Sequence, residues 1–592
     1  MENTKLLKSG EFLVREVDPQ DIFIPEEYDE EQQMIAQTCK DFLEAEVYPH
    51  MEQMEKGDRE LMKSLLKKSG DLGLMGISVS EEYGGFGQSF VTQMLAAETI
   101  GAASSFSVAF MAHCGIGTLP ILYFGNEDQR QRYVTKLATG EFLGAYCLTE
   151  PGAGSDANSG KTNAVPSTDG SNYILNGQKM WITNAGFADT QTVFAKIEND
   201  RVLSAFIVDA ASEGVVIGPD EHKMGIKGSS TAQIYFNDVK VPAANLLGNR
   251  GEGFRIALSI LHMGRIKLGA NVLGAAKKAI SDSVQYANER KQFGTQIANF
   301  GAIKHKLAEM VIRTFAAESG TYRVSKDIDV LIEQYKSEGC DKGRASIDAI
   351  AHYAVEAAIL KVYGSEMLDY VVDEAVQIHG GMGYSAEMEV ERGYRDSRIN
   401  RIFEGTNEIN RMLVVDTAMK RALKGQYGLF EEAEKLAEKI SGIEVYKTKE
   451  SDDFFTEKSG YVKNMKKIAL LLLDAASKTF ERKLVHEQEI LNNISDIIME
   501  IYIAESLALR VKKIENIKSE TGIYRDILDV YVYDSVQKIR KSALDAVYSI
   551  EGENTGDLLK IVSELSETEG VNIKEARRRV ADKLIEDNAY KF

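Results

Sequence analysis

The sequence predicts a mainly helical protein with a central β-domain and a further helical region towards its C-terminal end. Apolar residues recur with a helical period up to about residue 140 and again from residue 253, whereas short β-branched segments lie between these regions. Only 8 of the 592 residues are proline, which favours long helices. At about 100–200 residues per domain, a chain of this length forms several domains.

The changes of period divide the chain into five segments. We expect an N-terminal extension over residues 1–27, a helical domain over 28–147, a β-domain over 148–252, a helical bundle over 253–424 and a C-terminal helical extension over 425–592.

Each segment has its own pattern. In the first helical domain, EEQQMIAQTCKDFLEAEV and ELMKSLLKKSGDLGLMGI place apolar residues on one helical face. The next segment contains SNYILNGQKMWIT, DTQTVFAKI, LSAFIVDA and TAQIYFNDVKVP. These are bounded by Gly, Asn, Asp or Pro and predict strands of a small antiparallel sheet or barrel. The helical period returns from Gly253, is interrupted by the charged connection YKTKESDDFFTEKSG, and continues towards Phe592.

The composition argues against several classes of protein. Lys and Arg number 70 and Asp and Glu number 90, giving a net charge of −20, so we expect no nucleic-acid partner and no broad adsorption to an anionic membrane. The 4 cysteines form no C-x-x-C pair and the 8 histidines no H-E-x-x-H pair, which predicts neither a disulfide framework nor a metal site. The first residues mix both charge signs without a long apolar run, so the expected location is cytoplasmic.

Two segments of the β-region could contact a ligand. YCLTEPGAGSD (Tyr146–Asp156) is either a Gly/Pro/Ser linker or a backbone that runs close to a flat or phosphorylated ligand. It is not a dinucleotide fingerprint, because no G-x-G-x-x-G follows a strand and opens a helix. KMWITN (Lys179–Asn184) contains the only tryptophan, which on a strand is either a core residue or the wall of a cofactor site.

Two further segments lie in the predicted bundle. In QIHGGMGY, glycines end a helix and His379 is a buried histidine with its hydrogen bonds satisfied. In RIFEGTNEI, Thr406 or Asn407 caps the following helix, so Glu404 lies in the turn just before it. Glu404 could complement the helix dipole, or it could be a general base beside Phe403 whose pKa is raised by desolvation.

Taken together, these segments resemble the acyl-CoA dehydrogenase family over about residues 30–420. KMGIKGSSTAQIYFNDVKVP, LGNRGEGFRIAL and YANERKQFGTQIANFGAIKHKLAEM agree, and the last of these, with the long C-terminal extension, is similar to the very-long-chain branch. The resemblance implies a helical domain, a β-barrel domain, a four-helix bundle and an added C-terminal helical domain. It also implies an FAD-dependent oxidoreductase of fatty acid β-oxidation, which removes an α-proton and transfers a β-hydride to flavin, leaving a trans-2-enoyl-CoA.

The resemblance implies four groups of cofactor contacts and one of substrate contacts. Along the isoalloxazine and the ribityl-phosphate arm lie Tyr146, Cys147, Leu148, Thr149, Gly154 and Ser155. The other flavin face is flanked by Trp181, Ile182 and Thr183. The FAD of the neighbouring subunit is reached by Arg290, Gln292, Phe293, Gln377, Ile378, His379, Gly380 and Gly381. The FAD beside Glu404 is lined by Thr406, Asn407 and Glu408. The acyl-CoA is contacted by Ser155, Arg265, Phe403 and Gly405.

The catalytic base is expected to be Glu404. In the family the thioester carbonyl is held by the backbone N–H of the base and by a ribityl hydroxyl, which is an oxyanion-hole arrangement. Some branches place the base just before the bundle arginine, but that position here is Gly264, which cannot act as a base.

The resemblance leaves the electron acceptor, the chain length and the assembly open. An electron-transferring flavoprotein is the expected acceptor; an acyl-CoA oxidase using O₂, or a catalytically silent assembly protein, would have the same fold. A long-chain substrate is expected: Gly117 is compatible with the very-long-chain pattern, whereas Pro120 departs from it. The extension implies a homodimer, and in relatives it also implies contact with a membrane surface; here a helical domain packed on its own core is preferred.

Overall fold

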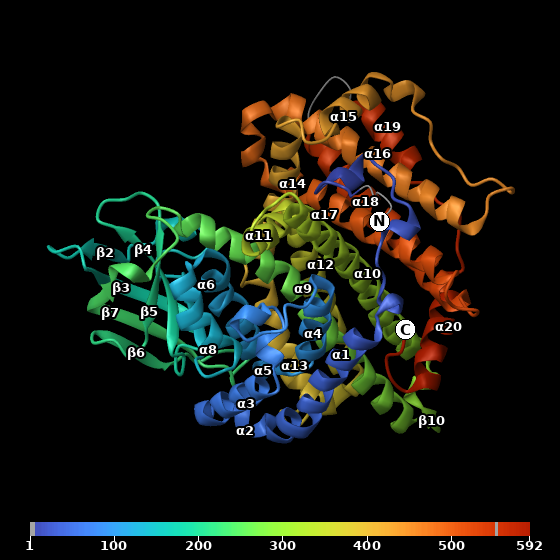
Figure 1. The fold of residues 1–592 in the computed structure, drawn as a ribbon. Coiled ribbons are helices and arrows are strands. Elements are labelled where there is room, and N and C mark those ends of the chain that lie inside the picture. Colours follow the sequence, from blue (N-terminus) through green and yellow to red (C-terminus); the bar gives the residue numbers. More distant parts are fainter. Residues whose placement is uncertain (1–5, 551–554) are drawn as a thin grey trace.

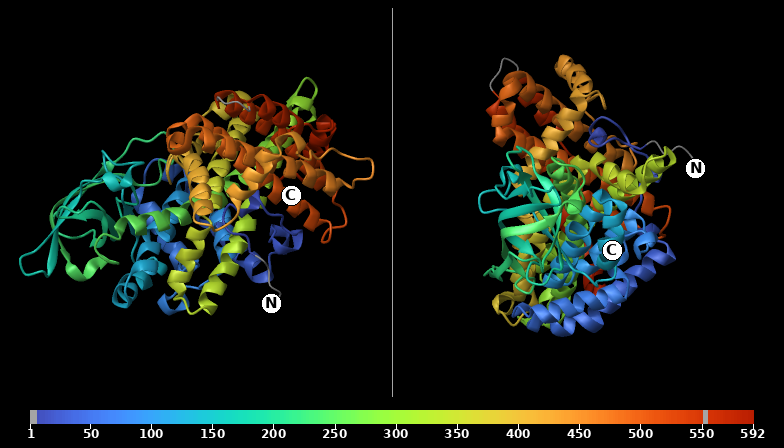
Figure 2. Two further views of the ribbon diagram at one scale, coloured as in Figure 1. Left: turned by 90° about the horizontal axis from the view of Figure 1, so that it is seen from above. Right: turned by 60° about the vertical axis from the view of Figure 1, so that its left-hand side comes forward.

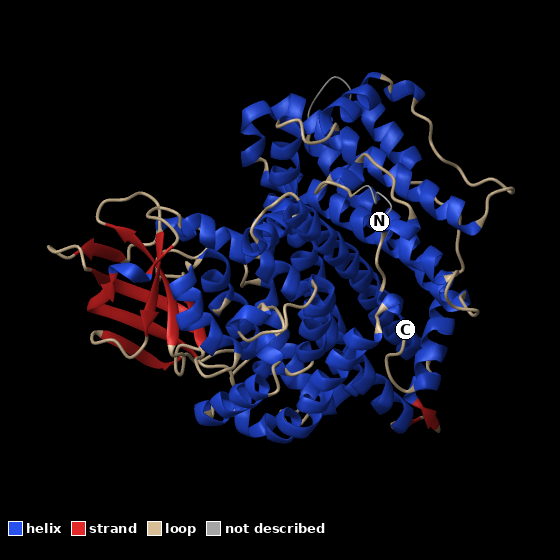
Figure 3. Cartoon of the chain, in the orientation of Figure 1, coloured by secondary structure: helices blue, strands red, loops and turns tan. Residues whose placement is uncertain are grey.

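The computed structural model describes residues 6–550 and 555–592. The first five residues of the predicted N-terminal extension, and residues 551–554 of the C-terminal extension, lie outside the described residues. Strands β1 to β8 form one β-domain on one side of the molecule, and the two-stranded hairpin of β9 and β10 lies on the other side (Figures 1 and 3). The rest of the described chain is mainly helical. The predicted fold class, mainly helical with a central β-domain, is confirmed.

The N-terminal helical domain consists of short helices packed against the bundle. They are α1 (Glu30–Phe42), α2 (Met51–Glu55), α3 (Arg59–Asp71), α4 (Phe90–Gly101), α5 (Ser104–Met111), α6 (Leu119–Phe124), α7 (Glu127–Gln129) and α8 (Thr135–Ala138). Asp29 begins α1 with a capping box, because its carboxylate accepts from the Gln32 N–H at 2.8 Å while Gln32 accepts from the Asp29 N–H at 3.1 Å.

The β-domain follows in one mixed sheet. Its strands are β1 (Gly144–Cys147), β2 (Asn163–Pro166), β3 (Asn172–Thr183), β4 (Thr190–Ile197), β5 (Ser204–Asp209), β6 (Val215–Asp220), β7 (Thr231–Pro242) and β8 (Leu246–Leu247). The order is β6-β7-β3-β2-β4-β5-β8, with β1 added on β4. The long segments predicted as strands correspond to β3, β4, β5 and β7.

The sequence pattern predicted an antiparallel sheet, but the observed sheet is mixed. Both β1 and β2 run parallel to β4. Alternation along one segment indicates which side chains are buried but contains no information about the direction of the partner strand. The predicted antiparallel pattern does hold for β3 with β7 and for β4 with β5.

The bundle is built around the long helices α9 (Gly253–Glu289), α10 (Gly301–Ser337), α12 (Ala354–His379) and α14 (Asn407–Leu423), with the shorter α11 (Lys342–His352) and α13 (Glu389–Ser397) between them. Helix α9 approaches α4 very closely, since a Cβ atom at Gly274 would lie 1.8 Å from the Glu98 carbonyl oxygen. Two segments, Ser104–Phe124 and Gly253–Glu289, are long and apolar enough to cross a membrane, but 83% and 67% of their most apolar windows are buried inside the fold. Such burial is typical of core helices.

The C-terminal extension lies along the bundle (Figure 2). Buried apolar residues of the two parts belong to one hydrophobic core. The helices of the extension are α15 (Leu429–Glu438), α16 (Phe454–Phe480), α17 (Gln488–Ile514), α18 (Gly522–Ser549), α19 (Thr555–Leu565) and α20 (Ile573–Asp587). Buried ion pairs join it to α10, including Arg510 with Glu318 at 2.7 Å and Arg577 with Glu309 at 2.7 Å. The extension is therefore a fixed part of the fold, packed on the bundle as well as on itself.

The N-terminal segment before α1 is held between the bundle and the extension. Ser9 Oγ donates to Glu356 of α12 at 2.5 Å, and Glu26 pairs with Arg510 of α17 at 2.9 Å. These contacts fix residues at the start of the chain against helices more than 340 residues away in sequence.

Candidate active site

The candidate base lies in a strained turn between α13 and α14. Glu404 has φ 58° and Gly405 has φ 84°, so both adopt the left-handed conformation that favours glycine. Thr406 ends the turn by capping α14, its side chain accepting from the Ile409 N–H at 3.3 Å. Of the two capping residues predicted, the structure selects Thr406. A non-glycine residue with positive φ is unusual, and such strain gathers at functional sites.

The carboxyl group of Glu404 lies against α9 at Gly264, a residue that has no side chain. Its Oε2 atom is buried and has no hydrogen-bond partner among the described residues. A Cβ atom at Gly264 would lie 2.6 Å from this Oε2. Burial raises the pKa of Glu404 to about 7, while Arg265 and Lys361 act to lower it. A carboxyl group with these properties is suited to accept a proton near neutral pH.

Arg265 holds the main chain of the turn rather than the carboxylate. It is 3% exposed, and its Nε donates to the Glu404 carbonyl at 3.2 Å. Asn410, one turn into α14, donates to the Gly405 carbonyl at 2.8 Å. These contacts fix the backbone while leaving the Glu404 carboxyl oxygen free.

The predicted flavin-contacting loop is anchored to β3 by a buried ion pair. Lys179 is fully buried, and its Nζ lies 2.6 Å from Glu150 Oε1 and donates to the Leu148 carbonyl at 3.2 Å. The Met180 N–H donates to the Thr149 carbonyl at 2.9 Å. Tyr146, Cys147 and Leu148 are buried, Thr149 is half-buried, and Gly154 and Ser155 are exposed.

Trp181 does not belong to the core, although a core role was one of its two predicted interpretations. It lies where the register between β3 and β7 shifts, has φ 60°, and is 53% exposed. Its neighbour Ile182 is 2% exposed and Thr183 is half-buried. A large aromatic side chain turned outwards beside an exposed Gly-rich loop, with open space around Gly154, fits a flat ligand such as an isoalloxazine ring.

The β-domain and the bundle meet close to Glu404. The Tyr146 hydroxyl donates weakly to the Ala257 carbonyl of α9 at 3.5 Å. Burial raises the pKa of Tyr146 well above its ordinary value, and the charge of Glu404 adds to this effect. Phe403, Gly405 and Thr406 are half-buried around the base, Asn407 is buried and Glu408 is exposed.

The residues predicted to reach a neighbouring FAD lie together at the other end of the bundle. Arg290, Gln292 and Phe293 lie at or in a hairpin of β9 (Lys291–Gln292) and β10 (Thr295–Gln296), with Phe293 95% exposed. Helix α12 ends nearby at His379, whose ring stacks on Tyr286 at 4.2 Å. Gln377, Gly380 and Gly381 are exposed, while Ile378 and His379 are buried.

This second group does not meet the flavin loop within one chain. About 33 Å of helix α9 separates Gly264 from Tyr286, and the hairpin lies on the opposite side of the molecule from the β-domain sheet (Figure 1). The two predicted halves of the FAD site can therefore act on one cofactor only if they come from different subunits.

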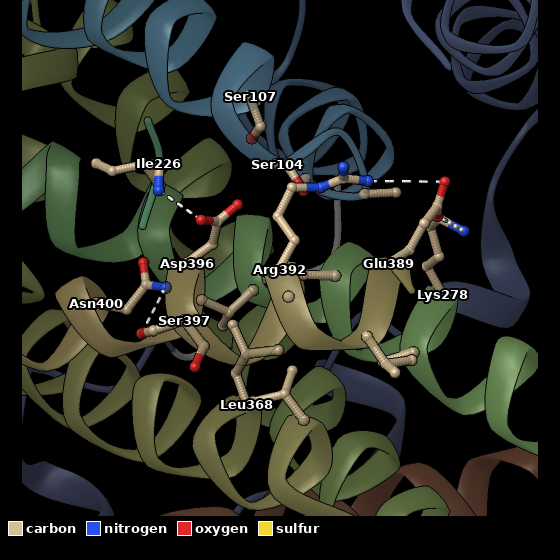
Figure 4. Close-up of a pocket in the computed structure, with 18 of the residues that line it drawn as sticks. Ser104, Ser107, Ile226, Lys278, Leu368, Glu389, Arg392, Asp396, Ser397 and Asn400 are labelled. Carbon is tan, nitrogen blue, oxygen red and sulfur yellow. Dashed lines mark hydrogen bonds and ion pairs between the residues drawn. The ribbon is translucent and has the colours of Figure 1, made fainter. Parts of the chain in front are cut away.

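A cavity of about 90 Å³ lies beside the middle of α9, between Gly264 and Tyr286 (Figure 4). Its lining comes from α4, α5, α9, α12, α13 and the turn before Glu404, and includes Gly101, Ser104, Ser107, Val108, Asn271, Val272, Ala275, Leu368, Val372, Asp396, Ile399 and Asn400. Asp396 accepts from the Ile226 N–H with one oxygen, and burial raises its pKa to about 6. Most of the inner wall is apolar, with Lys278, Glu389 and Arg392 among its charged lining residues.

The sequence analysis missed one buried cation beside the base. Lys361 of α12 is fully buried, and its Nζ donates to Asn407 Oδ1 at 2.6 Å. Burial lowers the pKa of Lys361 to about 7, opposed first by the charge of Glu404. A single lysine within the apolar run AAILKVYG was the available signal, since a cation on a buried helix face needs a partner.

Family models match the chain over most of its length. The acyl-CoA dehydrogenase N-terminal domain matches residues 29–141, the middle domain residues 145–239, and two C-terminal domain models residues 251–419 and 464–564. The segment matched over 464–564 belongs to the C-terminal extension.

Relatives and solved structures agree with this assignment. A probable acyl-CoA dehydrogenase of Bacillus subtilis is 42% identical over 587 residues, covering 98% of each chain. The very long-chain specific mitochondrial acyl-CoA dehydrogenase of Rattus norvegicus is 40% identical over 413 residues; the match covers 66% of this chain and 60% of the rat protein. A crystal structure of an acyl-CoA dehydrogenase complexed with FAD from Bacillus anthracis superposes with a TM-score of 0.96 at 43% identity, covering 99% of this chain and 100% of that one. The chain thus belongs to the acyl-CoA dehydrogenase family of FAD-dependent oxidoreductases.

Proposed function

We propose that this enzyme oxidises a long-chain fatty acyl-CoA to its trans-2-enoyl-CoA and passes the electrons to an electron-transferring flavoprotein. The observation on which the proposal rests is the buried, unpartnered Glu404 Oε2 in the space that Gly264 leaves open. An α-proton beside a thioester is weakly acidic, so its removal needs a base that is desolvated and oriented.

The residues of the turn divide the work of proton removal. Glu404 takes the α-proton on Oε2, while Arg265 and Asn410 hold the surrounding carbonyl groups. Among the described residues, nothing accepts a hydrogen bond from the Glu404 N–H, which leaves this donor for the thioester oxygen as negative charge develops there. Bound FAD supplies the hydride acceptor.

The position of the cavity supports a long acyl chain. Asn271 lies seven residues after Gly264, which is almost two turns, so both face the same side of α9 about 10 Å apart. An extended chain advances about 1.3 Å per carbon, so roughly eight carbons reach from the base to the cavity. Chains of about twelve or more carbons would fill the space between Val108 and Ala275.

The assembly proposed is a homodimer in the cytoplasm, acting in fatty acid β-oxidation. It is supported by the separation of the two FAD-contacting groups along α9 and by the extension, which covers part of the bundle. Light scattering of the holoenzyme should give two chains per particle; four would contradict the dimer. Arg290→Ala should lower FAD content and loosen the dimer together.

One experiment separates the dehydrogenase from an oxidase and from a silent protein. The purified yellow holoenzyme is mixed with palmitoyl-CoA, first without oxygen and then with air or an electron-transferring flavoprotein. Flavin bleaching with slow peroxide release and fast turnover on the flavoprotein is expected. Fast peroxide release would identify an oxidase, and an unbleached flavin would exclude catalysis on this substrate.

A further inference from the structure

Lys361 is a buried ammonium group that has one hydrogen-bond acceptor in the part of the chain that the structure describes. It lies on α12, is fully buried, and donates to Asn407 Oδ1 at 2.6 Å. Asn407 is the first residue of α14, three residues after Glu404. Because a lysine has only donors, it depends on the amide oxygen of Asn407 pointing towards it.

The orientation of Asn407 is set by groups on its other side. Its Nδ2 donates to Ser365 Oγ at 3.0 Å and to Glu366 Oε1 at 3.0 Å. A flipped amide would place its NH₂ group against the ammonium of Lys361 and its oxygen against a carboxylate, so only one orientation satisfies both neighbours. Glu366 therefore determines how Asn407 meets Lys361.

Glu366 is in turn fixed from the C-terminal extension. Arg411 of α14 binds both Glu366 oxygens, at 2.8 and 2.9 Å, and its Nε donates to Asp496 Oδ1 of α17 at 2.7 Å. A two-point contact between a guanidinium and a carboxylate sets direction as well as distance. The hydrogen-bonded series from Asp496 through Arg411, Glu366 and Asn407 to Lys361 thus joins α17 to the turn that contains the base.

We propose that Lys361 is a positioning residue for Glu404, and that the C-terminal extension holds it in place through Asp496, Arg411, Glu366 and Asn407. This inference rests on the proposed role of Glu404 as the base. A fixed cation beside the turn favours the ionised carboxylate that removes the proton, without touching the substrate. The extension then contributes to catalysis from a helix outside the bundle.

The charges around the two groups determine the expected sign. The groups that interact electrostatically with Glu404 are Arg265 of α9, Lys361 of α12 and Tyr146 of β1. Arg265, Glu366 and Glu408 surround Lys361 besides Glu404 itself. Loss of the Lys361 charge removes an effect that lowers the pKa of Glu404, so proton removal shifts to higher pH.

The test compares variants of the holoenzyme by the pH dependence of flavin bleaching with palmitoyl-CoA. Lys361→Met should raise the apparent pKa of flavin bleaching by about one unit and slow bleaching up to about ten-fold at pH 6.5. Lys361→Arg keeps a positive charge and should recover part of the bleaching rate. Hydrogen exchange of the peptide over residues 402–412 should become faster in Lys361→Met, which reports on the turn independently of activity.

Asp496→Ala tests the contribution of the extension. It should shift the profile upwards by a smaller amount, because Arg411 and Glu366 lose their orientation. A simple charge effect has the opposite sign, since removing a distant negative charge lowers a carboxyl pKa. Asp534→Ala is the matched control: Asp534 of α18 pairs with Arg577 at 2.7 Å, and no hydrogen bond or ion pair between the described residues links this pair to Asn407.

Three outcomes would overturn the inference: an unchanged profile in Lys361→Met, a downward shift in Asp496→Ala, or equal shifts in Asp496→Ala and Asp534→Ala. Failure of the proposed function is distinguishable, because the wild-type flavin would then not be bleached by acyl-CoA at any pH.

Discussion

The carboxyl group of Glu404 lies where a side chain at position 264 would be: a Cβ atom on Gly264 would lie 2.6 Å from Glu404 Oε2 and 2.8 Å from its carboxyl carbon. The carboxyl group fills the volume that a side chain on α9 would otherwise take. Gly264 was identified from the sequence only as a residue unable to act as a base. The structure gives it a positive role, because it is the absence of a side chain that admits the base.

Gly264→Ala should slow flavin reduction while the protein still folds. The added methyl group must displace the Glu404 carboxyl, which is the end of a flexible side chain, so the cost in stability should stay near 1 kcal/mol. Misplacing a base by about 1 Å costs on the order of 10²-fold in rate. Stopped-flow bleaching measures this. Gly522→Ala on α18 is the control, because none of the described atoms lies within 4 Å of a Cβ there and the residue is remote from the cavity. Equal bleaching rates in the two variants would contradict the inference that Glu404 needs the space left by Gly264.

Glu404→Gln should stabilise the fold, and increasingly so as the pH rises. The pKa of Glu404 is raised to about 7 in the fold, against about 4.3 in the unfolded chain. Between these values the unfolded chain releases a proton that the folded chain keeps, so the wild-type protein loses stability as pH increases. The full loss amounts to about 4 kcal/mol and is absent from Glu404→Gln. Urea unfolding at pH 5 and pH 8 measures the difference; a constant difference would exclude a raised pKa.

Glu150→Ala should destabilise the protein and release FAD. It leaves the ammonium of Lys179 buried without its carboxylate, which costs about 3–5 kcal/mol. It also frees the exposed loop before β2 that the flavin requires. Unfolding and flavin content are the two measurements. Glu198→Ala breaks an exposed pair with Arg250 and should cost less than about 1 kcal/mol with FAD retained. If both variants kept their flavin, the anchoring role of Glu150 would be wrong.

Ala275→Phe should shift the chain-length preference downwards. The larger side chain fills the cavity between α5 and α9, so a sixteen-carbon chain can no longer extend into it. We expect kcat/KM on palmitoyl-CoA to fall at least ten-fold, while octanoyl-CoA, which ends before the cavity, is unaffected. A series of acyl-CoAs from four to twenty carbons tests this. A uniform loss on all chain lengths would show that the cavity is not part of the acyl site.

The sequence allowed the fold class to be predicted because its two periodicities are local. Long segments such as β3 and α9 repeat one pattern over many residues, whereas the parallel pairing of β1 and β2 with β4 depends on strands distant in sequence. The packing of the extension onto α10 could likewise not be predicted from the sequence, since ion pairs such as Arg510 with Glu318 join residues far apart in the chain.

The candidate site was predictable in part for the same reason. Glu404 and the cap at Thr406 follow from a short motif, so they could be identified from neighbours in sequence. The outward position of Trp181 depends on a register shift between two strands. Lys361 depends on an amide in another helix. Neither leaves a signal in its own segment strong enough to assign a role.

Anaerobic bleaching of the flavin in Glu404→Gln by palmitoyl-CoA tests the central claim most directly. Glutamine preserves the size of the side chain but cannot accept the proton, and loss of a general base costs about 10²–10⁴-fold or more in a closed site. FAD content and acyl-CoA binding should survive, because neither depends directly on the carboxylate. The account predicts that substrate binds and bleaching nearly disappears. A Glu404→Gln protein that bleaches at the wild-type rate would place the base elsewhere and contradict the mechanism.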